Sequence, residues 1–144
     1  MERGTLTGTI PSEIGRLSNL IFIDLDFNQL TGTLPTQLYT LVNMTQLDLN
    51  NNRLQGKIEG IESFSKLEFL QLHSNGFTGT IPEQVGTTMG LLGTFTLHDT
   101  NFSGVVPLGL CDLVVDGTLM SLIADCAGVD PEIECECCTD CRPL

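Results

Sequence analysis

The sequence predicts an α/β-type solenoid, in which short strands from successive coils stack into a parallel β-sheet. Two observations predict this fold. Four segments of the 144-residue chain align with one another, beginning at Leu20, Met44, Leu67 and Leu92. Each contains an alternating x-L-x-L-x run, and an Asn, a Gly and a Pro recur at fixed positions after most of these runs. Repetition at a fixed period is typical of a coil whose units bury their apolar faces against their neighbours.

The alternating runs come first in each coil and predict short strands with the leucines turned inward. Stacking the coils places these apolar residues in two buried columns. One column contains Leu25, Leu49, Leu72 and Leu97, and the other contains Ile23, Leu47, Leu70 and Phe95.

We assign structural rather than catalytic roles to the residues after each strand. Asn28, Asn52 and Asn75 form a third column, in which Thr100 takes the fourth place. An Asn inside the coil can hydrogen-bond loop backbone that water does not reach. The glycines at 8, 32, 56, 79 and 104 permit a tight bend, and the Pro that follows most of them ends strand pairing.

This pattern resembles leucine-rich repeats, in the L-T-G-x-I-P subclass typical of plant receptors and plant enzyme inhibitors of the polygalacturonase-inhibitor kind. The motif reads LTGTIP at Leu6, LTGTLP at Leu30 and FTGTIP at Phe77. It is matched only in part by LQGKIE at Leu54 and FSGVVP at Phe102. The resemblance implies a right-handed coil with a concave parallel sheet and few or short helices and 3-10 turns on the convex side. We assign 1–126 to the solenoid, with about four full and two half repeats, and 127–144 to a cysteine-rich C-terminal cap.

The two ends of the coil differ. All the cysteines lie toward the C-terminus, and their even number predicts a disulfide cap built from Cys111, Cys126, Cys135, Cys137, Cys138 and Cys141. Their spacing does not decide the pairing. A zinc site is the alternative, because Cys135, Cys138 and Cys141 offer C-x-x-C twice.

No cysteine precedes Leu6, and the first strand would leave Ile21 and Phe22 uncovered at a sheet edge. We expect upstream repeats of a longer protein, or a partner chain, to cover this edge. The alternative is a naturally short solenoid with a frayed start.

The resemblance also implies that the outward strand positions of the concave sheet bind the ligand. These positions are Phe22, Asp24, Asp26, Phe27, Gln46, Asp48, Asn50, Asn51, Phe69, Gln71, His73, Ser74, Thr94, Thr96, His98 and Asp99, with Ser121, Ile123 and Asp125 in the last half repeat. Exposed Phe22 and Phe69 would be aromatic anchors, although scattered surface Phe residues are ordinary.

His73 and His98 are neighbours in this set, with Asp99 and Asp125 close to them. They suggest a metal site or an acid–base pair, and the alternative is a pair of solvated histidines. We favour the alternative, because an open sheet offers no water-excluded pocket. Unperturbed, both would titrate near pH ~6.5.

The composition argues against some classes of binding partner. The net charge of −12 disfavours nucleic acid and anionic membrane surfaces as partners, and no apolar run is long enough to insert into a bilayer. No catalytic constellation, metal site or cofactor motif is predicted. The sequons at Asn43 and Asn101 are glycosylation candidates that fit a secretory route.

We therefore expect a non-enzymatic, secreted or extracellular recognition module, or a fragment of an ectodomain. It would bind a protein, peptide or glycan, and Asp24, Asp26 and Asp48 favour a basic partner. The alternative is an ice-binding solenoid that uses exposed threonine pairs. These pairs are Thr7/Thr9, Thr31/Thr33 and Thr78/Thr80, interrupted by Gln55/Lys57 and Ser103/Val105.

Overall fold

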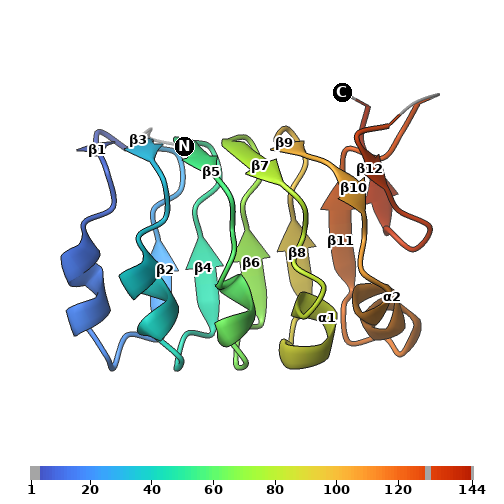
Figure 1. Cartoon of the computed structure of the whole chain (residues 1–144), viewed down its shortest axis with the longest axis horizontal. Coiled ribbons are helices and arrows are strands. Elements are labelled where there is room, and N and C mark those ends of the chain that lie inside the picture. The colour runs from blue at the N-terminus through green and yellow to red at the C-terminus, as the bar shows by residue number, and fades with distance from the viewer. Residues whose placement is uncertain (1–3, 129–130, 144) are drawn as a thin grey trace.

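The chain forms a short solenoid whose coils follow one another along the long axis of the molecule (Figure 1). The structure is a computed structural model that describes residues 4–128 and 131–143. A typical coil contains a strand of the concave sheet, a turn, a strand of a second sheet, and a short helical turn on the opposite side. Among these residues, no helix is long and apolar enough to cross a membrane.

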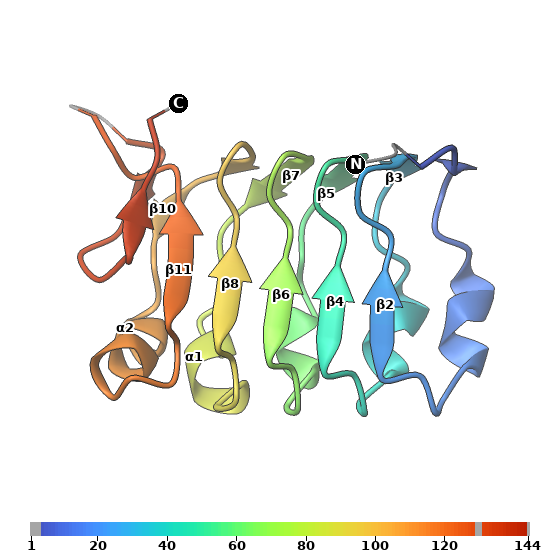
Figure 2. The ribbon, with the colours of Figure 1, turned by 180° about the vertical axis from the view of Figure 1, so that it is seen from behind.

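The concave sheet is parallel throughout, and Figure 2 shows it in front. Its order is β13-β11-β8-β6-β4-β2. The strands are β2 (Phe22–Asp24), β4 (Gln46–Asp48), β6 (Phe69–Gln71), β8 (Thr94–Thr96), β11 (Ser121–Ala124) and β13 (Asp140–Cys141). The predicted parallel sheet is confirmed. Its β13 strand is contributed by the tail, which the repeat pattern does not predict.

A second parallel sheet, with the order β1-β3-β5-β7-β9, lies on the other side of each turn. Its strands are β1 (Thr7–Gly8), β3 (Gln29–Gly32), β5 (Arg53–Gly56), β7 (Gly76–Gly79) and β9 (Asn101–Phe102). We expected pairing only in the concave sheet. The segment after each Asn is extended, and its backbone groups pair with the neighbouring coil because buried amides need partners.

The remaining side of the coil carries short helical turns, as the resemblance implies. They are η1 (Ser12–Arg16), η2 (Thr36–Thr40), η3 (Ile61–Ser63), α1 (Val85–Thr88) and α2 (Leu108–Val115). Pro11, Pro35 and Pro107 directly precede η1, η2 and α2, where the fixed φ of proline suits a helix start. α1 and α2 pack so closely that a Cβ at Gly86 would clash with the backbone of Gly109.

The predicted core columns are buried, with one exception. Leu47, Leu49, Leu70 and Phe95 are fully inaccessible. Leu25 is only half-buried, because it directly follows β2, the edge strand of the concave sheet.

The asparagine column has the predicted role. The side chain of Asn52 donates to the carbonyls of Leu25 and Leu49 at 2.8 and 3.0 Å, and it accepts from the Leu30 amide at 3.0 Å. Asn75 repeats these contacts one coil later. Both residues are half-buried rather than fully enclosed.

The C-terminal tail closes the coil with three disulfides, which confirms the predicted cap. The pairs are Cys111–Cys137, Cys126–Cys141 and Cys135–Cys138. The zinc alternative is therefore not the state seen here, because every cysteine is bonded to another. The tail also adds β12 (Ile133–Glu134), which pairs with β10 (Gly104–Val105).

The N-terminal end is covered in part. The first half coil leaves Ile10, Ile23, Leu30 and Leu34 only 5–7% exposed, so it covers the core better than its missing strand suggested. At the start of β2, Ile21 and Phe22 remain 56% and 47% exposed, as predicted.

Candidate functional site

The candidate site is the outer surface of the concave sheet, where strand alternation presents two rows of side chains. The first row runs Phe22, Gln46, Phe69, Thr94 and Ser121, and the second runs Asp24, Asp48, Gln71, Thr96 and Ile123. Phe69 is 43% exposed, and it stands two strands from the exposed Phe22, with Gln46 between them. Two aromatic rings therefore project from the same row of one open surface, with one residue between them.

An acidic cluster of Asp24, Asp26 and Asp48 lies beside the two rings. One carboxylate oxygen from each lies within 4.8 Å of the others. Burial raises the pKa of Asp26, with further contributions from the charge and hydrogen bonding of Asp24. Burial likewise raises the pKa of Asp48, against the lowering effect of its hydrogen bonds with Asn50. No Lys or Arg of the described chain forms an ion pair with these carboxylates, so the cluster is an uncompensated region of negative charge.

A histidine pair occupies the next part of the surface. The rings of His73 and His98 stack with their centroids 4.4 Å apart. Burial, followed by the proximity of His98, lowers the pKa of His73 to about 4. His73 is thus perturbed, and the value near 6.5 of an unperturbed ring does not apply to it. The ring also lies 3.3 Å from the hydroxyl of Ser74, which donates to Asp99 at 3.2 Å.

The surroundings of the histidine pair are polar side chains of neighbouring coils. Among the residues that the structure describes, the side-chain groups close enough together to hold a metal ion are the acidic cluster and three cysteines of the tail, which are disulfide-bonded, and neither group includes a histidine. Asp99 contacts the serine rather than an imidazole. Both histidines are half-buried, and Nδ1 of His98 is buried with no hydrogen-bond partner among the described residues, so the pair is less solvated than expected.

Several residues predicted to face outward are in fact buried. Asp48, Asn50, Thr96 and Asp125 are 7%, 4%, 6% and 2% exposed. Asp48 accepts hydrogen bonds from Asn50 and, at 3.1 Å, from Gln71. Strand alternation predicts the face on which a side chain lies, but not how far its neighbours cover it.

Asp125 has a structural role that its column did not indicate. Its carboxylate accepts from the backbone amides of Asp99 and Thr100 at 3.1 and 3.3 Å. It therefore holds the turn of the preceding coil rather than facing a ligand.

Phe27 and Asp99 were also predicted on the concave face, but they lie in the turns between the two sheets. Phe27, Asn51, Ser74 and Asp99 have left-handed φ values of 49–55°. This conformation takes the chain out of the strand direction, so strand alternation no longer applies to these residues.

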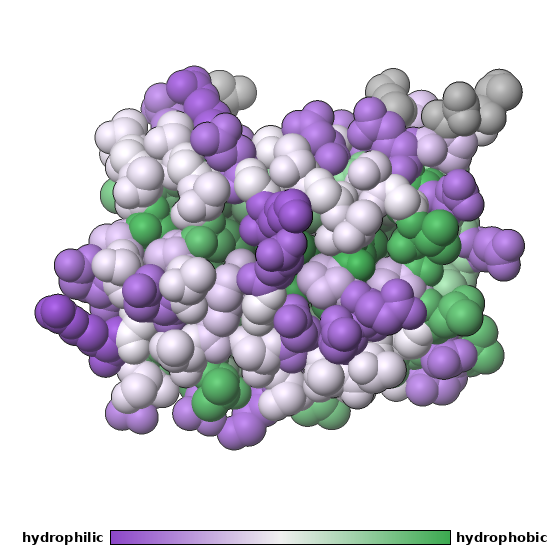
Figure 3. All heavy atoms as spheres, viewed as in Figure 1, coloured by the Kyte–Doolittle hydropathy of each residue, from purple (hydrophilic) through white to green (hydrophobic). Residues whose placement is uncertain are grey.

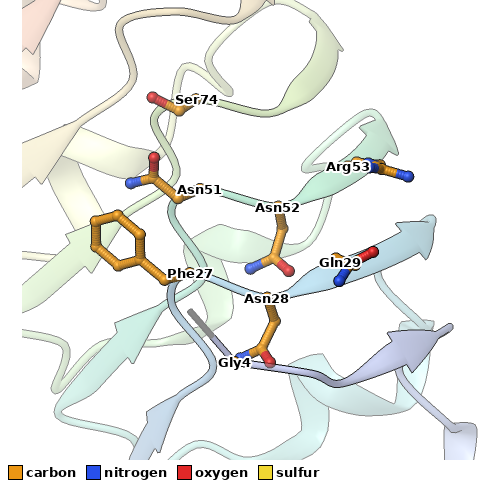
Figure 4. A pocket seen from close by; sticks show the side chains of 8 residues that line it. All are labelled: Gly4, Phe27, Asn28, Gln29, Asn51, Asn52, Arg53 and Ser74. Atoms are coloured by element: carbon orange, nitrogen blue, oxygen red, sulfur yellow. The ribbon is translucent and has the colours of Figure 1, made fainter. Parts of the chain in front are cut away.

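These turns form a cavity of about 430 Å³ that sequence reasoning missed (Figure 4). It is lined by Gly4, Phe27, Asn28, Gln29, Asn51, Asn52, Arg53 and Ser74. Figure 4 places Phe27 and Asn51 at one side of it, and Gln29 and Arg53 at the other. The only hint of this cavity in the sequence was that the alternation of inward and outward residues ends after each strand.

The predicted threonine pairs lie on or beside the second sheet, and all six residues are exposed. Thr9 and Thr33 also have a packing role, because a Cβ added at Gly32 or Gly56 would come within 2.8 Å of their methyl groups. The ion pair of Lys57 and Glu59, at 3.0 Å, interrupts the array.

Other surface features are dispersed. Asn101 is exposed in β9, whereas Asn43 is half-buried and accepts from Lys66 at 2.8 Å. Glycosylation at either position stays a prediction. Leu108 and Val115 of α2 are 76% and 85% exposed. Figure 3 shows apolar atoms gathered toward the C-terminal end, where this helix lies.

Comparison with known proteins supports the repeat assignment. The Leucine Rich Repeat family model matches residues 19–41, 43–64 and 66–87. Among curated proteins, no match to this chain is found.

Solved structures resemble the whole solenoid. The plant peptide hormone receptor RGFR1, in complex with RGF2, is 30% identical with a TM-score of 0.76, over 84% of this chain and 19% of the receptor chain. The Arabidopsis receptor kinase HAESA, in complex with the peptide hormone IDA and the co-receptor SERK1, is 26% identical with a TM-score of 0.76, over 85% and 20%. A plant ice-binding protein is 28% identical with a TM-score of 0.72, over 90% and 39%. The chain thus spans about a fifth of each of these two receptors.

Proposed function

Because the chain is a leucine-rich-repeat protein with a disulfide-bonded C-terminal cap, we propose that it is a non-enzymatic recognition module outside the cell. Its ligand is a protein or peptide that lies on the concave sheet. Three disulfides favour an oxidising, extracellular setting. A glycan remains in the wider ligand class that the resemblance implies.

The observation that carries this proposal is the pair of exposed rings, Phe22 and Phe69. They stand two strands apart, and adjacent strands are separated by ~4.8 Å, so an extended segment can contact both rings at once. Partly exposed aromatic side chains are typical anchors of protein interfaces. The receptors RGFR1 and HAESA are seen in complexes with RGF2 and with IDA, which supports a peptide as the ligand.

Charge adds a preference for a basic segment. Asp24 and Asp26 lie next to the rings, and no cation of the described chain pairs with them. A Lys or Arg of the ligand would compensate this charge while its aliphatic stem packs on the rings. His73 does not oppose this preference at neutral pH, since its lowered pKa keeps its ring uncharged.

The open edge of β2 is a second contact region. Among the described residues, β2 pairs with β4 alone, and Ile21 is exposed beside it. Such an edge can accept another strand. We infer that a further coil or a partner chain covers it in the functional assembly.

Selection from a displayed random peptide library against the immobilised protein tests the proposal. Selected peptides should be rich in Lys and Arg, and their affinity should fall with added salt. Phe69→Ala should weaken the best peptide by about 30-fold, as expected for an anchor worth about 2 kcal/mol. Thr33→Ala, on the other side of the coil, is the matched control and should leave binding unchanged. Retained binding by Phe69→Ala with loss in Thr33→Ala would place the binding surface elsewhere.

Ice binding is the second candidate, supported by the exposed threonines and by the likeness to the plant ice-binding protein. Lys57 and its ion pair with Glu59 oppose it by breaking the regular array. Thermal hysteresis measured on the intact protein decides between the two candidates. Clear hysteresis that is lost in Thr31→Val would favour the threonine surface, and its absence would leave the concave sheet.

A further inference from the structure

The cavity of about 430 Å³ in the turns lies outside the concave sheet and has no part in the binding surface proposed above. Its volume is within the range of small-molecule sites, which is roughly 300–1,000 Å³. Asn28 and Asn52 lie between its two side walls (Figure 4), and their side-chain amides already hold the backbone of the coil. Any ligand chemistry therefore comes from the walls, whose residues differ from coil to coil.

Phe27, in one wall, occupies a position where a bulky side chain is unfavourable. The corresponding residues of the next three coils are Asn51, Ser74 and Asp99, and all four have left-handed φ values of 49–55°. Asn and Asp tolerate this conformation, whereas a bulky side chain is disfavoured in it. Phe27 does not offset this cost by filling the core, since it is only half-buried. An aromatic ring held in an unfavourable conformation at the wall of a cavity points to contact with a ligand.

The walls also supply hydrogen-bonding groups that the fold does not use. The side chains of Gln29 and Arg53 are exposed in the wall opposite Phe27, and they form no hydrogen bond or ion pair with another described side chain. Asn51 donates to the side chain of Asn50 at 2.6 Å, which leaves its own side-chain oxygen as an acceptor. The donor wall is local to the first two coils, because Gly76 takes the corresponding place in the third.

A pyranose sugar has the chemistry that matches these walls. Its ring carries apolar C–H groups on its faces, and the hydroxyls around its edge each donate and accept hydrogen bonds. We propose that this cavity binds a neutral saccharide, with one sugar ring packed against Phe27. The amide of Gln29 and the guanidinium of Arg53 donate to its hydroxyls from the opposite wall, and Asn51 accepts from a hydroxyl beside the aromatic ring.

Charge around the cavity favours a neutral saccharide over an acidic one. Arg53 is the single cationic side chain of the lining. Asp24 and Asp26 come just before Phe27, and no described Lys or Arg pairs with them. These carboxylates and the net charge of −12 repel a polyanion. The cavity therefore differs in its ligand from the concave surface, where the same carboxylates favour a basic peptide.

Isothermal titration calorimetry of the intact chain with cellotetraose, xylotetraose and mannotetraose tests this site, with tetragalacturonate as the acidic counterpart. We expect at least one of the neutral probes to bind, with an affinity that added salt does not change, because the probe carries no charge. Tetragalacturonate should bind more weakly than that probe. If no neutral probe binds, or if tetragalacturonate binds more tightly, the proposal is overturned.

Phe27→Asn separates loss of the site from loss of the fold. Asn suits the left-handed conformation, so the thermal unfolding temperature should hold or rise, whereas affinity for the neutral probe should fall by about tenfold. Arg53→Ala should also weaken binding. Asn101→Ala is the matched control, because Asn101 is exposed at the corresponding position two coils further on and lies outside the cavity.

Unchanged affinity in Phe27→Asn, or an equal loss in Asn101→Ala, would contradict the assignment. Peptide binding to the concave sheet is scored separately, through Phe69→Ala, so either proposal can fail without the other.

Discussion

Replacing Asn52 with Leu should lower the free energy of unfolding by about 2 kcal/mol. The side chain amide of Asn52 donates to carbonyls that each have another donor. Leu25 O is also contacted by Asn28, and Leu49 O is also contacted by Asn75. The amide of Leu30 is different, because its bond to Asn52 Oδ1 satisfies it inside a residue that is 5% exposed. Leaving one buried donor unpaired costs about 1–3 kcal/mol.

Counting the backbone groups that lose a hydrogen-bond partner also ranks Asn75 and Asn28, the other asparagines of the column. Asn75→Leu should cost more than Asn52→Leu, because it leaves the Leu54 amide and also removes the side-chain donor to Leu72 O. Asn28→Leu should cost least, since Leu6, whose amide it would leave unpaired, is 52% exposed and water can replace the bond.

Urea unfolding followed by far-UV circular dichroism measures the three changes on one scale. The expected order of destabilisation is Asn75→Leu, then Asn52→Leu, then Asn28→Leu. Equal costs for all three, or a neutral Asn52→Leu, would refute the reasoning from unpaired backbone groups.

Two further predictions concern pH and the tail. The pKa of His73 falls from 6.5 unfolded to about 4 folded, so the unfolded state binds the proton first. Stability should therefore be full above pH 6.5 and decline as pH falls toward 4, by about 1–2 kcal/mol after discounting for partial exposure. His73→Gln should flatten this part of the pH–stability curve, and an unchanged slope would contradict the assigned pKa. Removing Cys111–Cys137, with a sequence separation of 26, should cost about 3.5 kcal/mol, whereas removing Cys135–Cys138, with a separation of 3, should cost about 2. Thermal unfolding of the two double-alanine variants measures this, and a reversed order would show that native contacts outweigh loop closure.

The repeat pattern predicted the structural features that every coil shares. The buried leucine columns, the parallel concave sheet and the bonds of Asn52 follow from residues that recur at one spacing, because each coil meets the same neighbours. The face of Phe22 and Phe69 followed in the same way from strand alternation, and their exposure bears it out.

What sequence could not predict depends on contacts between different kinds of segment. Asp48 is buried because Asn50 and Gln71 cover it and hydrogen-bond to it. The carboxylate of Asp125 accepts a hydrogen bond from the backbone of the previous coil. The cavity beside Arg53 exists because left-handed turns end the alternation. Which cysteines pair depends on where β12 and β13 pack against the last coil. The repeat pattern does not determine their position.

The tail contributes one strand to the six-stranded sheet and another that pairs with β10, whereas at the opposite end no described residue pairs with the outer side of β1 or β2. The molecule therefore has a polarity. At the C-terminal end, β13 is itself an edge strand of the six-stranded sheet, but it is only two residues long and Cys126–Cys141 ties it to the coil. A very short edge strand offers little for strand addition, so assembly through this sheet should favour the β2 edge over the β13 edge.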